Sequence, residues 1–270
     1  SSLSGAFLAE RGAPNIISLV GLLLGGYFAA GGSSALNMYF EKDIDKNMGR
    51  TKNRPIVEGK LQPKNALVFG IILIVASFLI LFTINNLLAA LLALLGSFLY
   101  VGFYTLYIKQ KTVQNIVVGG AAGAIPPLVG YASISNSITL EALYLFLIIF
   151  FWTPPHFWAL AIMIKDDYEK AKIPMLPVIK GIKNTSLQIF LYSIILLFIT
   201  ILTGVVANSL GWIFMISSML AGGIFIYKSF KLFKIANKKE AISTYIYSLL
   251  YLFVIMSLVI VDSSIQFMEF

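Results

Sequence analysis

The chain has 270 residues, of which 59% are hydrophobic and only 12% are charged, and its net charge is +8. Soluble domains carry about 25% charged residues, so this composition excludes an ordinary water-soluble globule. Having no cysteine excludes disulfide scaffolds, iron–sulfur clusters and covalently attached haem, and a single histidine excludes multi-histidine metal sites. The sequence therefore predicts an integral membrane protein.

Runs without any charged residue predict the membrane spans. Two of these runs, 65–108 and 184–227, contain 44 residues each, which is enough for two helical crossings of about 20 residues. Asn85-Asn86 and Asn208–Gly211 supply the turns between them. We therefore expect an all-α, polytopic bundle of eight membrane-spanning helices. Their approximate ranges are 14–40, 65–83, 87–108, 114–133, 139–164, 185–207, 211–230 and 241–262.

The cationic residues predict the orientation in the membrane. The loops 41–64, 109–111, 165–183 and 228–240 hold 19 of the 20 Lys and Arg residues. Because Lys and Arg in short loops stay cytoplasmic, we expect all four loops on the cytoplasmic side of the cell (plasma) membrane. We therefore expect the chain to lie in the lipid bilayer and to have no nucleic-acid partner. The first ten residues are interpreted as the tail of an earlier span.

The first charged loop begins with three oxygen-bearing side chains in helical register. Asn37, Glu41 and Asp45 are spaced at i, i+4 and i+8, so they share one face of a helix. Oxygen ligands stacked in this way suit Mg²⁺, which takes one or two carboxylates together with water and phosphate oxygens. Asp43 points away from Glu41 if the helix continues, so it is the weaker candidate ligand. The alternative is an acidic loop balanced by its own lysines.

A second acidic cluster, with Asp166, Asp167 and Glu169, follows a later span on the same side. Two acidic patches that face each other could hold metal ions on a diphosphate and stabilise it as a leaving group. Nearby cations are candidates for binding its oxygens. These cations are Arg50, Arg54, Lys109, Lys111 and Lys172.

The spans between the charged loops offer only apolar and aromatic surface, which suits a long hydrocarbon tail. Tyr39, Phe103, Tyr104 and Tyr107 are candidates for stabilising a carbocation by cation–π contact, or for simple packing. His156 follows Pro154-Pro155 within a span. It is a candidate haem-iron ligand or proton carrier, with a hydrogen-bonded structural role as the alternative.

Four blocks of the sequence resemble the UbiA superfamily of intramembrane prenyltransferases, and in particular its haem-farnesylating subgroup. The blocks are 37–55, 104–131, 152–160 and 167–177. The resemblance implies nine transmembrane helices around a central cavity and Mg²⁺-dependent cleavage of farnesyl diphosphate. It also implies transfer of the farnesyl group to a vinyl carbon of haem B, which gives haem O. Haem A synthase or a terminal oxidase are the further partners that it suggests.

The resemblance also implies roles for individual residues. The implied catalytic residues are Asn37, Glu41, Asp45, Asp167 and His156. The implied metal ligands are Glu41, Asp43, Asp45, Asp166 and Asp167, holding one or two ions. The implied substrate-binding residues are Arg50, Arg54, Tyr104, Lys109, Lys111, Asn115, Tyr168 and Lys172.

The chain departs from the pattern of the superfamily in three ways. Glu41 replaces the usual Asp, the second site lacks the usual DxxxD spacing, and eight spans are predicted instead of nine. We interpret residues 1–270 as a single prenyltransferase domain with a truncated or missing N-terminal helix. Two alternatives remain: a UbiA-type enzyme with another aromatic or tetrapyrrole acceptor, such as a quinone precursor or chlorophyllide, and a cation-coupled membrane transporter.

Overall fold

The computed structural model describes residues 1–266, and residues 267–270 lie outside the described part. Eight helices in this part are long and apolar enough to cross a membrane, which confirms the predicted number and the all-α class. They are α2 (Ile16–Asp45), α3 (Pro63–Ile80) with η1 (Leu81–Asn85), α4 (Leu87–Phe98) with η2 (Leu99–Ile108), α5 (Asn115–Ser135), α6 (Leu140–Met163), α9 (Gly181–Val206), α10 (Trp212–Ile235) and α11 (Lys238–Gln266).

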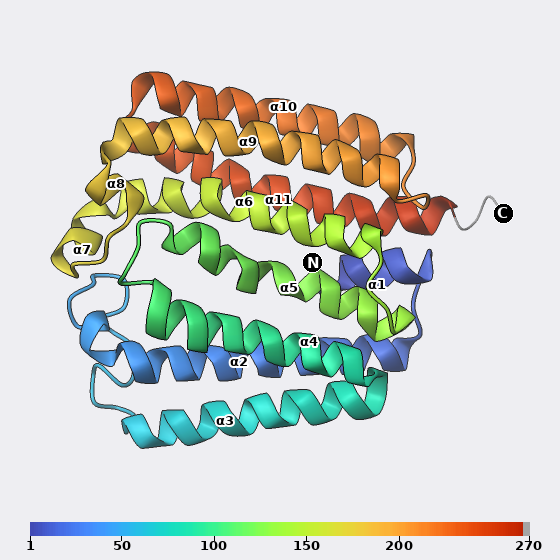
Figure 1. Cartoon of the computed structure of the whole chain (residues 1–270), viewed down its shortest axis with the longest axis horizontal. Coiled ribbons are helices and arrows are strands. Elements are labelled where there is room, and N and C mark those ends of the chain that lie inside the picture. The colour runs from blue at the N-terminus through green and yellow to red at the C-terminus, as the bar shows by residue number, and fades with distance from the viewer. Residues whose placement is uncertain (267–270) are drawn as a thin grey trace.

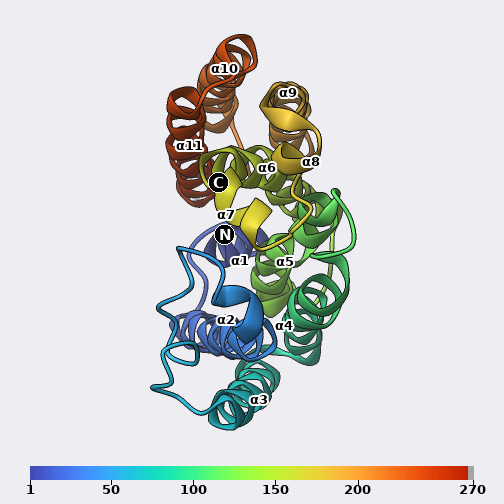
Figure 2. The same cartoon turned by 90° about the vertical axis from the view of Figure 1, so that its left-hand side faces the viewer.

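The long helices lie side by side along the length of the molecule (Figure 1). The segments 46–62, 109–114, 164–180 and 236–237 connect them at one end of the bundle, which faces the viewer in Figure 2. The four charged loops that the sequence predicted on one side therefore do lie at the same end. Both acidic clusters are placed at this end.

Two short helices, α7 (Lys165–Lys170) and α8 (Leu176–Ile179), lie within the third charged loop and were not predicted. A third, α1 (Ser2–Glu10), occupies the first residues, for which the sequence predicted the tail of a span. α1 packs against α5 so tightly that a side chain at Gly5 would collide with the backbone of Pro127, and one at Gly130 would collide with the backbone of Ser2. Glycine at these two positions lets the two backbones touch.

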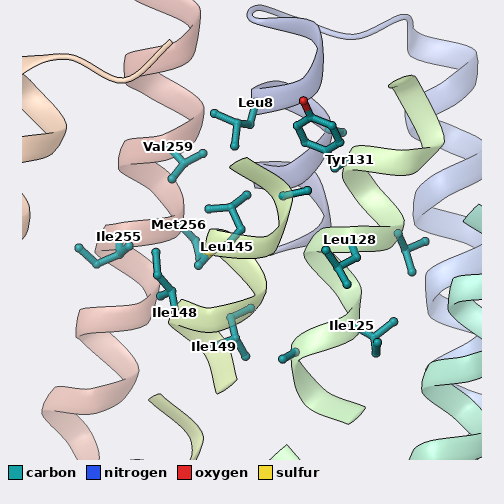
Figure 3. Packing of buried hydrophobic residues seen from close by; sticks show 14 of the residues in the cluster. Leu8, Ile125, Leu128, Tyr131, Leu145, Ile148, Ile149, Ile255, Met256 and Val259 are labelled. Carbon is teal, nitrogen blue, oxygen red and sulfur yellow. The ribbon is translucent and has the colours of Figure 1, made fainter. Parts of the chain in front are cut away.

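The apolar core lies where α1, α5, α6 and α11 meet. Leu8, Leu128, Leu145, Ile148 and Met256 belong to one buried cluster there (Figure 3). Because lipid is as apolar as these side chains, close packing and hydrogen bonds hold such helices together more than the hydrophobic effect does.

One buried carboxylate connects the ends of two helices on the opposite side of the bundle from the charged loops. Oδ2 of Asp262, on α11, accepts hydrogen bonds from the backbone N–H of Gly211 at 2.6 Å and of Phe214 at 3.2 Å. These N–H groups begin α10 and have no partner within the helix. Asp262 therefore caps α10 from a neighbouring helix, and the positive end of the helix dipole stabilises its charge.

Candidate active site

The end of α2 next to the charged loop 46–62 carries three buried polar side chains on one face. Asn37, Glu41 and Asp45 are exposed by only 3%, 3% and 2%. The helix continues unbroken to Asp45, so the i, i+4, i+8 spacing brings the three together as predicted. Burial of two carboxylates is costly unless cations or hydrogen-bond donors accompany them.

Two cations from other segments accompany these carboxylates. Nη1 of Arg54 lies 2.6 Å from Oδ2 of Asp45 and 3.9 Å from Oε2 of Glu41, and it donates a hydrogen bond to Oδ1 of Asn37 at 3.3 Å. Nζ of Lys109 lies 2.5 Å from Oε1 of Glu41. The site is therefore a compact network of opposite charges, with the cations placed beside the carboxylates rather than in bulk solvent.

A π-helical segment, η2, positions the residues that complete the network. The hydroxyl of Thr105 donates to the carbonyl oxygen of Tyr100 at 2.9 Å and accepts a hydrogen bond from Nδ2 of Asn37 at 3.1 Å. Since its only hydrogen goes to Tyr100, the hydroxyl can only accept from Asn37. Thr105 therefore fixes the amide of Asn37 with Oδ1 turned towards Arg54. Short π-helical insertions are frequent at functional sites.

Asn37, Glu41, Arg54 and Lys109 of this network line one wall of a cavity of about 250 Å³ between α2, η2, α5 and α6, whereas Asp45 does not line it. Aromatic rings of Tyr100, Tyr104, Trp152 and Phe157 line its other walls. The ring of Tyr104 fits only because residue 119 is glycine, since a Cβ there would collide with it. Aromatic faces around a charged site can stabilise a cation.

A second, mainly apolar chamber of about 330 Å³, with four serines in its lining, adjoins the first. Tyr100 and Gly123 line both spaces. Small residues of α2, α4 and α5 form the walls of the second chamber, among them Ala30, Ala93 and Ala122. A space with charged lining thus lies next to a mainly apolar one, and their combined volume falls in the range of about 300–1,000 Å³ that is usual for ligand sites.

The second acidic cluster contributes one carboxylate to the same end of the cavity. Asp167, on α7, lies against the loop that follows α2, where a Cβ at Gly49 would be 3.1 Å from its Oδ2. Its neighbour Tyr168 lines the cavity. Burial raises the pKa of Tyr168, and Arg50, Glu41 and Asp167 are the charges that influence it. Tyr168 is therefore a neutral hydroxyl donor between the two acidic clusters.

Eight predicted site residues do not line this cavity: Asp45 and Asp167, which lie close to it, Asn115 and His156, described below, and four that point elsewhere. Asp43 is exposed and forms an ion pair with Lys46 at 2.8 Å, because the helix continues and turns it away from Glu41. Asp166 is exposed on α7. Lys111 lies 3.7 Å above the ring of Tyr107, and Lys172 is exposed in the turn after α7.

Asn115 has a supporting position rather than a lining one. Its Nδ2 donates to the carbonyl oxygen of Lys109 at 2.9 Å, and the side chain is fully buried. This bond ties the start of α5 to the end of η2, and so fixes the backbone from which Lys109 extends towards Glu41. Of the predicted lining aromatics, Phe103 and Tyr107 are exposed instead.

His156 faces α11 behind the cavity. Its ring stacks between Trp152 and Tyr245, with centroids 4.2 and 4.7 Å away, and its Nδ1 lies 2.7 Å from the hydroxyl of Ser248. That hydroxyl donates to the carbonyl oxygen of Tyr245 at 2.6 Å. Nδ1 must therefore carry the hydrogen, and Nε2 keeps the lone pair.

The donor set fits one divalent ion better than two. Within residues 1–266 no three acidic or histidine side chains form a metal cluster of their own. Glu41 and Asp45 offer two carboxylates, and the amide oxygen of Asn37 lies on the same face. This suits Mg²⁺, which takes one or two carboxylates and completes its octahedron with water and phosphate oxygens.

Sequence reasoning missed Tyr100 and Thr105. Both lie in a run with no charged residue, and nothing in that run distinguishes a π-helix from an ordinary α-helix. Trp152 belongs to the block 152–160 that carries the family resemblance, but the sequence did not indicate that it lines the cavity.

Comparisons with known proteins agree with this geometry. The sequence profile of the UbiA prenyltransferase family matches residues 1–256. A curated relative from Roseiflexus sp. (strain RS-1), called protoheme IX farnesyltransferase, is 44% identical over 262 residues, which are 97% of this chain and 49% of that protein. The chain spans about half the length of this relative and of several others with the same name.

Two solved structures share the fold. Digeranylgeranylglyceryl phosphate synthase aligns with a TM-score of 0.81 and 17% identity, over 97% of this chain and 91% of that chain. A UbiA homologue from Archaeoglobus fulgidus, bound to DMAPP and Mg²⁺, aligns with a TM-score of 0.64 and 16% identity, over 97% and 94%. At these identities the two likenesses establish the fold alone.

Proposed function

The chain belongs to the UbiA prenyltransferase family, and we propose that it transfers a farnesyl group from farnesyl diphosphate to a vinyl group of haem B, giving haem O and diphosphate. The observation that carries this proposal is that the two spaces are neighbours and share Tyr100 and Gly123 in their linings. One contains a buried network of carboxylates and cations, and the other is mainly apolar. A prenyl diphosphate is likewise charged at one end and a hydrocarbon at the other. The relatives called protoheme IX farnesyltransferase support the choice of acceptor.

The diphosphate is proposed to lie at the polar end. Arg50, Arg54 and Lys109 line this end of the cavity and can donate to its oxygens. Glu41 and Asp45, with the amide oxygen of Asn37, would hold Mg²⁺. When bound, Mg²⁺ would supply positive charge to the departing diphosphate. The Archaeoglobus fulgidus homologue was solved bound to DMAPP and Mg²⁺, which supports metal-dependent binding of a prenyl diphosphate by this fold.

Asp167 and Tyr168 are proposed to close the site from the opposite side. Tyr168 keeps its proton because burial raises its pKa, so it can donate to a phosphate oxygen. Asp167 lies beside Gly49, in the loop that also carries Arg50. We propose that Asp167 orients Arg50 and takes part in holding the metal-bound diphosphate.

The reaction consists of one bond broken and one bond formed at the prenyl carbon. The carbon–oxygen bond of farnesyl diphosphate breaks, and its electron pair leaves with the diphosphate. The resulting allylic cation lies beside the rings of Tyr100 and Tyr104, whose faces can stabilise it. The π electrons of the haem vinyl group form the new carbon–carbon bond. Water then adds to the new cation and releases a proton, which leaves a hydroxyethylfarnesyl side chain.

His156 is proposed to position the porphyrin. Its Nδ1 is occupied by Ser248, so Nε2 has the lone pair that iron ligation requires. Trp152, which stacks on His156, and Phe157, which follows it, both line the cavity. Purified protein should bind haem B, and His156→Ala should change its absorbance spectrum. An unchanged spectrum would remove His156 as a ligand but not the proposed reaction.

The four charged loops are proposed to face the cytoplasm of a cell-membrane protein, because they carry nearly all of the cationic residues. Incubation of purified protein with isotope-labelled farnesyl diphosphate, Mg²⁺ and haem B tests the proposed function. We expect label in the haem fraction. Label on a quinone-precursor ring or chlorophyllide instead would identify another UbiA-type acceptor, and a transporter would give no prenylated product.

A further inference from the structure

A third hollow lies on the outer face of α10 and α11, and it shares no lining residue with the two spaces of the candidate active site. It has a volume of about 390 Å³ and is lined by Lys228, Lys239, Ile242, Ser243, Ile246, Tyr247 and Leu250. We call it the α10–α11 groove. None of these seven residues belongs to the network around Glu41.

The groove has a charged end and an apolar end. Lys239 begins α11 beside the loop 236–237, and Lys228 comes from the last two turns of α10. Further along α11, Ile246 and Leu250 are 59% and 53% exposed. The lining therefore changes from ammonium groups near the loop to hydrocarbon towards the middle of the span. This order matches a phospholipid whose headgroup lies at the membrane surface.

The ammonium of Lys228 is held in place rather than free to extend. Its Nζ donates to the hydroxyl of Ser243 at 2.9 Å and lies 5.6 Å from the centre of the Tyr247 ring. Among the described residues, neither Lys228 nor Lys239 has an ion pair with a carboxylate. Glu240, the one acidic residue of the charged segment 228–240, is paired with Lys231 at 3.1 Å. The groove thus has two uncompensated cations at its charged end.

We propose that the α10–α11 groove binds one anionic phospholipid. Its phosphate lies between the ammonium groups of Lys228 and Lys239, and one acyl chain follows Ile242, Ile246 and Leu250. Basic pockets between transmembrane helices are known as sites for anionic headgroups, and each Lys near such a headgroup strengthens binding severalfold. The exposed apolar stripe favours a lipid over a free phosphate ion, because only a lipid covers it.

The test measures the dissociation constant of phosphatidylglycerol from delipidated protein in detergent, by native mass spectrometry. The double variant Lys228→Gln/Lys239→Gln should bind phosphatidylglycerol roughly tenfold or more weakly than the parent. The matched control Lys60→Gln/Lys64→Gln removes two exposed lysines at the same end of the bundle, and its dissociation constant should change less than about twofold. Lys228→Arg should retain binding, since it keeps the charge.

Phosphatidylcholine with the same acyl chains separates charge from hydrocarbon, and it should bind the parent as weakly as phosphatidylglycerol binds the double variant. Millimolar inorganic phosphate separates a lipid from a free anion, and it should not displace phosphatidylglycerol. Equal binding of the two lipids, equal binding by the parent and the double variant, or displacement by inorganic phosphate would overturn the proposal. The double variant should unfold at the same temperature as the parent protein, which would show that it is folded.

Discussion

The ammonium group of Lys109, at the end of η2, lies 2.5 Å from the carboxylate of Glu41, near the end of α2. These residues are 68 positions apart in the sequence, and both are largely withdrawn from solvent. The pair joins the first acidic cluster to the wall of the cavity that carries Tyr100 and Tyr104. It also places a cation at the point where a diphosphate would need one.

Lys109→Gln should lower kcat/KM for farnesyl diphosphate by about 30-fold or more, because it leaves Glu41 buried without its partner and removes a donor to the diphosphate. The matched comparison is Lys111→Gln, two residues away, whose side chain lies over the Tyr107 ring outside the cavity. Its effect should be below about threefold. Steady-state kinetics of the two variants with purified protein checks this, and equal losses would contradict the assigned geometry.

Asp45→Asn should abolish haem O formation, with a loss of at least about 100-fold, because it removes a carboxylate proposed to hold Mg²⁺. Asp43→Asn provides the control on the same turn of α2, since Asp43 is exposed and paired only with Lys46. It should keep nearly full activity. Mass spectrometry of the haem product measures both variants. Full activity of Asp45→Asn in a folded protein would refute the metal role.

Thr105→Val should lower kcat by about tenfold, since the hydroxyl that fixes the amide of Asn37 is lost while the shape of the side chain is kept. Thr105→Ser restores the hydroxyl and should restore most of the activity. The Mg²⁺ concentration that gives half-maximal rate should rise in the valine variant only. If the valine variant is as active as the serine variant, the hydrogen bond from Asn37 to Thr105 does not contribute to the activity.

Asp262→Leu should destabilise the protein by about 1–2 kcal/mol, because the first backbone N–H groups of α10 lose their cap. Asp262→Asn keeps a capping oxygen and should cost much less. Thermal unfolding in detergent measures both, and kinetics serves as the control, since Asp262 lies at the end of the bundle away from the candidate active site. A leucine variant as stable as the parent would show that the cap contributes nothing.

Much of the fold could be predicted because an uninterrupted apolar composition is enough to indicate a membrane span. Uninterrupted apolar runs fixed the eight helices to within a few residues, and the positions of Lys and Arg grouped the loops at one end. The register of Asn37, Glu41 and Asp45 could be predicted because an α-helix repeats every 3.6 residues. Short helices such as α7 have no such signal, and their positions depend on packing against the rest of the bundle.

The sequence could not show the features that depend on an unusual backbone or on distant contacts. In the π-helix, hydrogen bonds join residues five apart, which brings Thr105 next to the carbonyl of Tyr100 and redirects the residues that follow. Whether Lys109 or Lys111 reaches Glu41 depends on this change of direction. Likewise, the pairing of His156 with Ser248 links positions 92 residues apart, and no spacing rule connects them.

The measurement that tests the central claim most directly is mass spectrometry of haem after incubation of the purified chain with isotope-labelled farnesyl diphosphate, Mg²⁺ and haem B. The account predicts a labelled haem that has gained a farnesyl group and a water molecule, and no such product from Asp45→Asn. A folded parent protein that binds both substrates but yields no labelled haem, or an Asp45→Asn variant that yields as much as the parent, would contradict it.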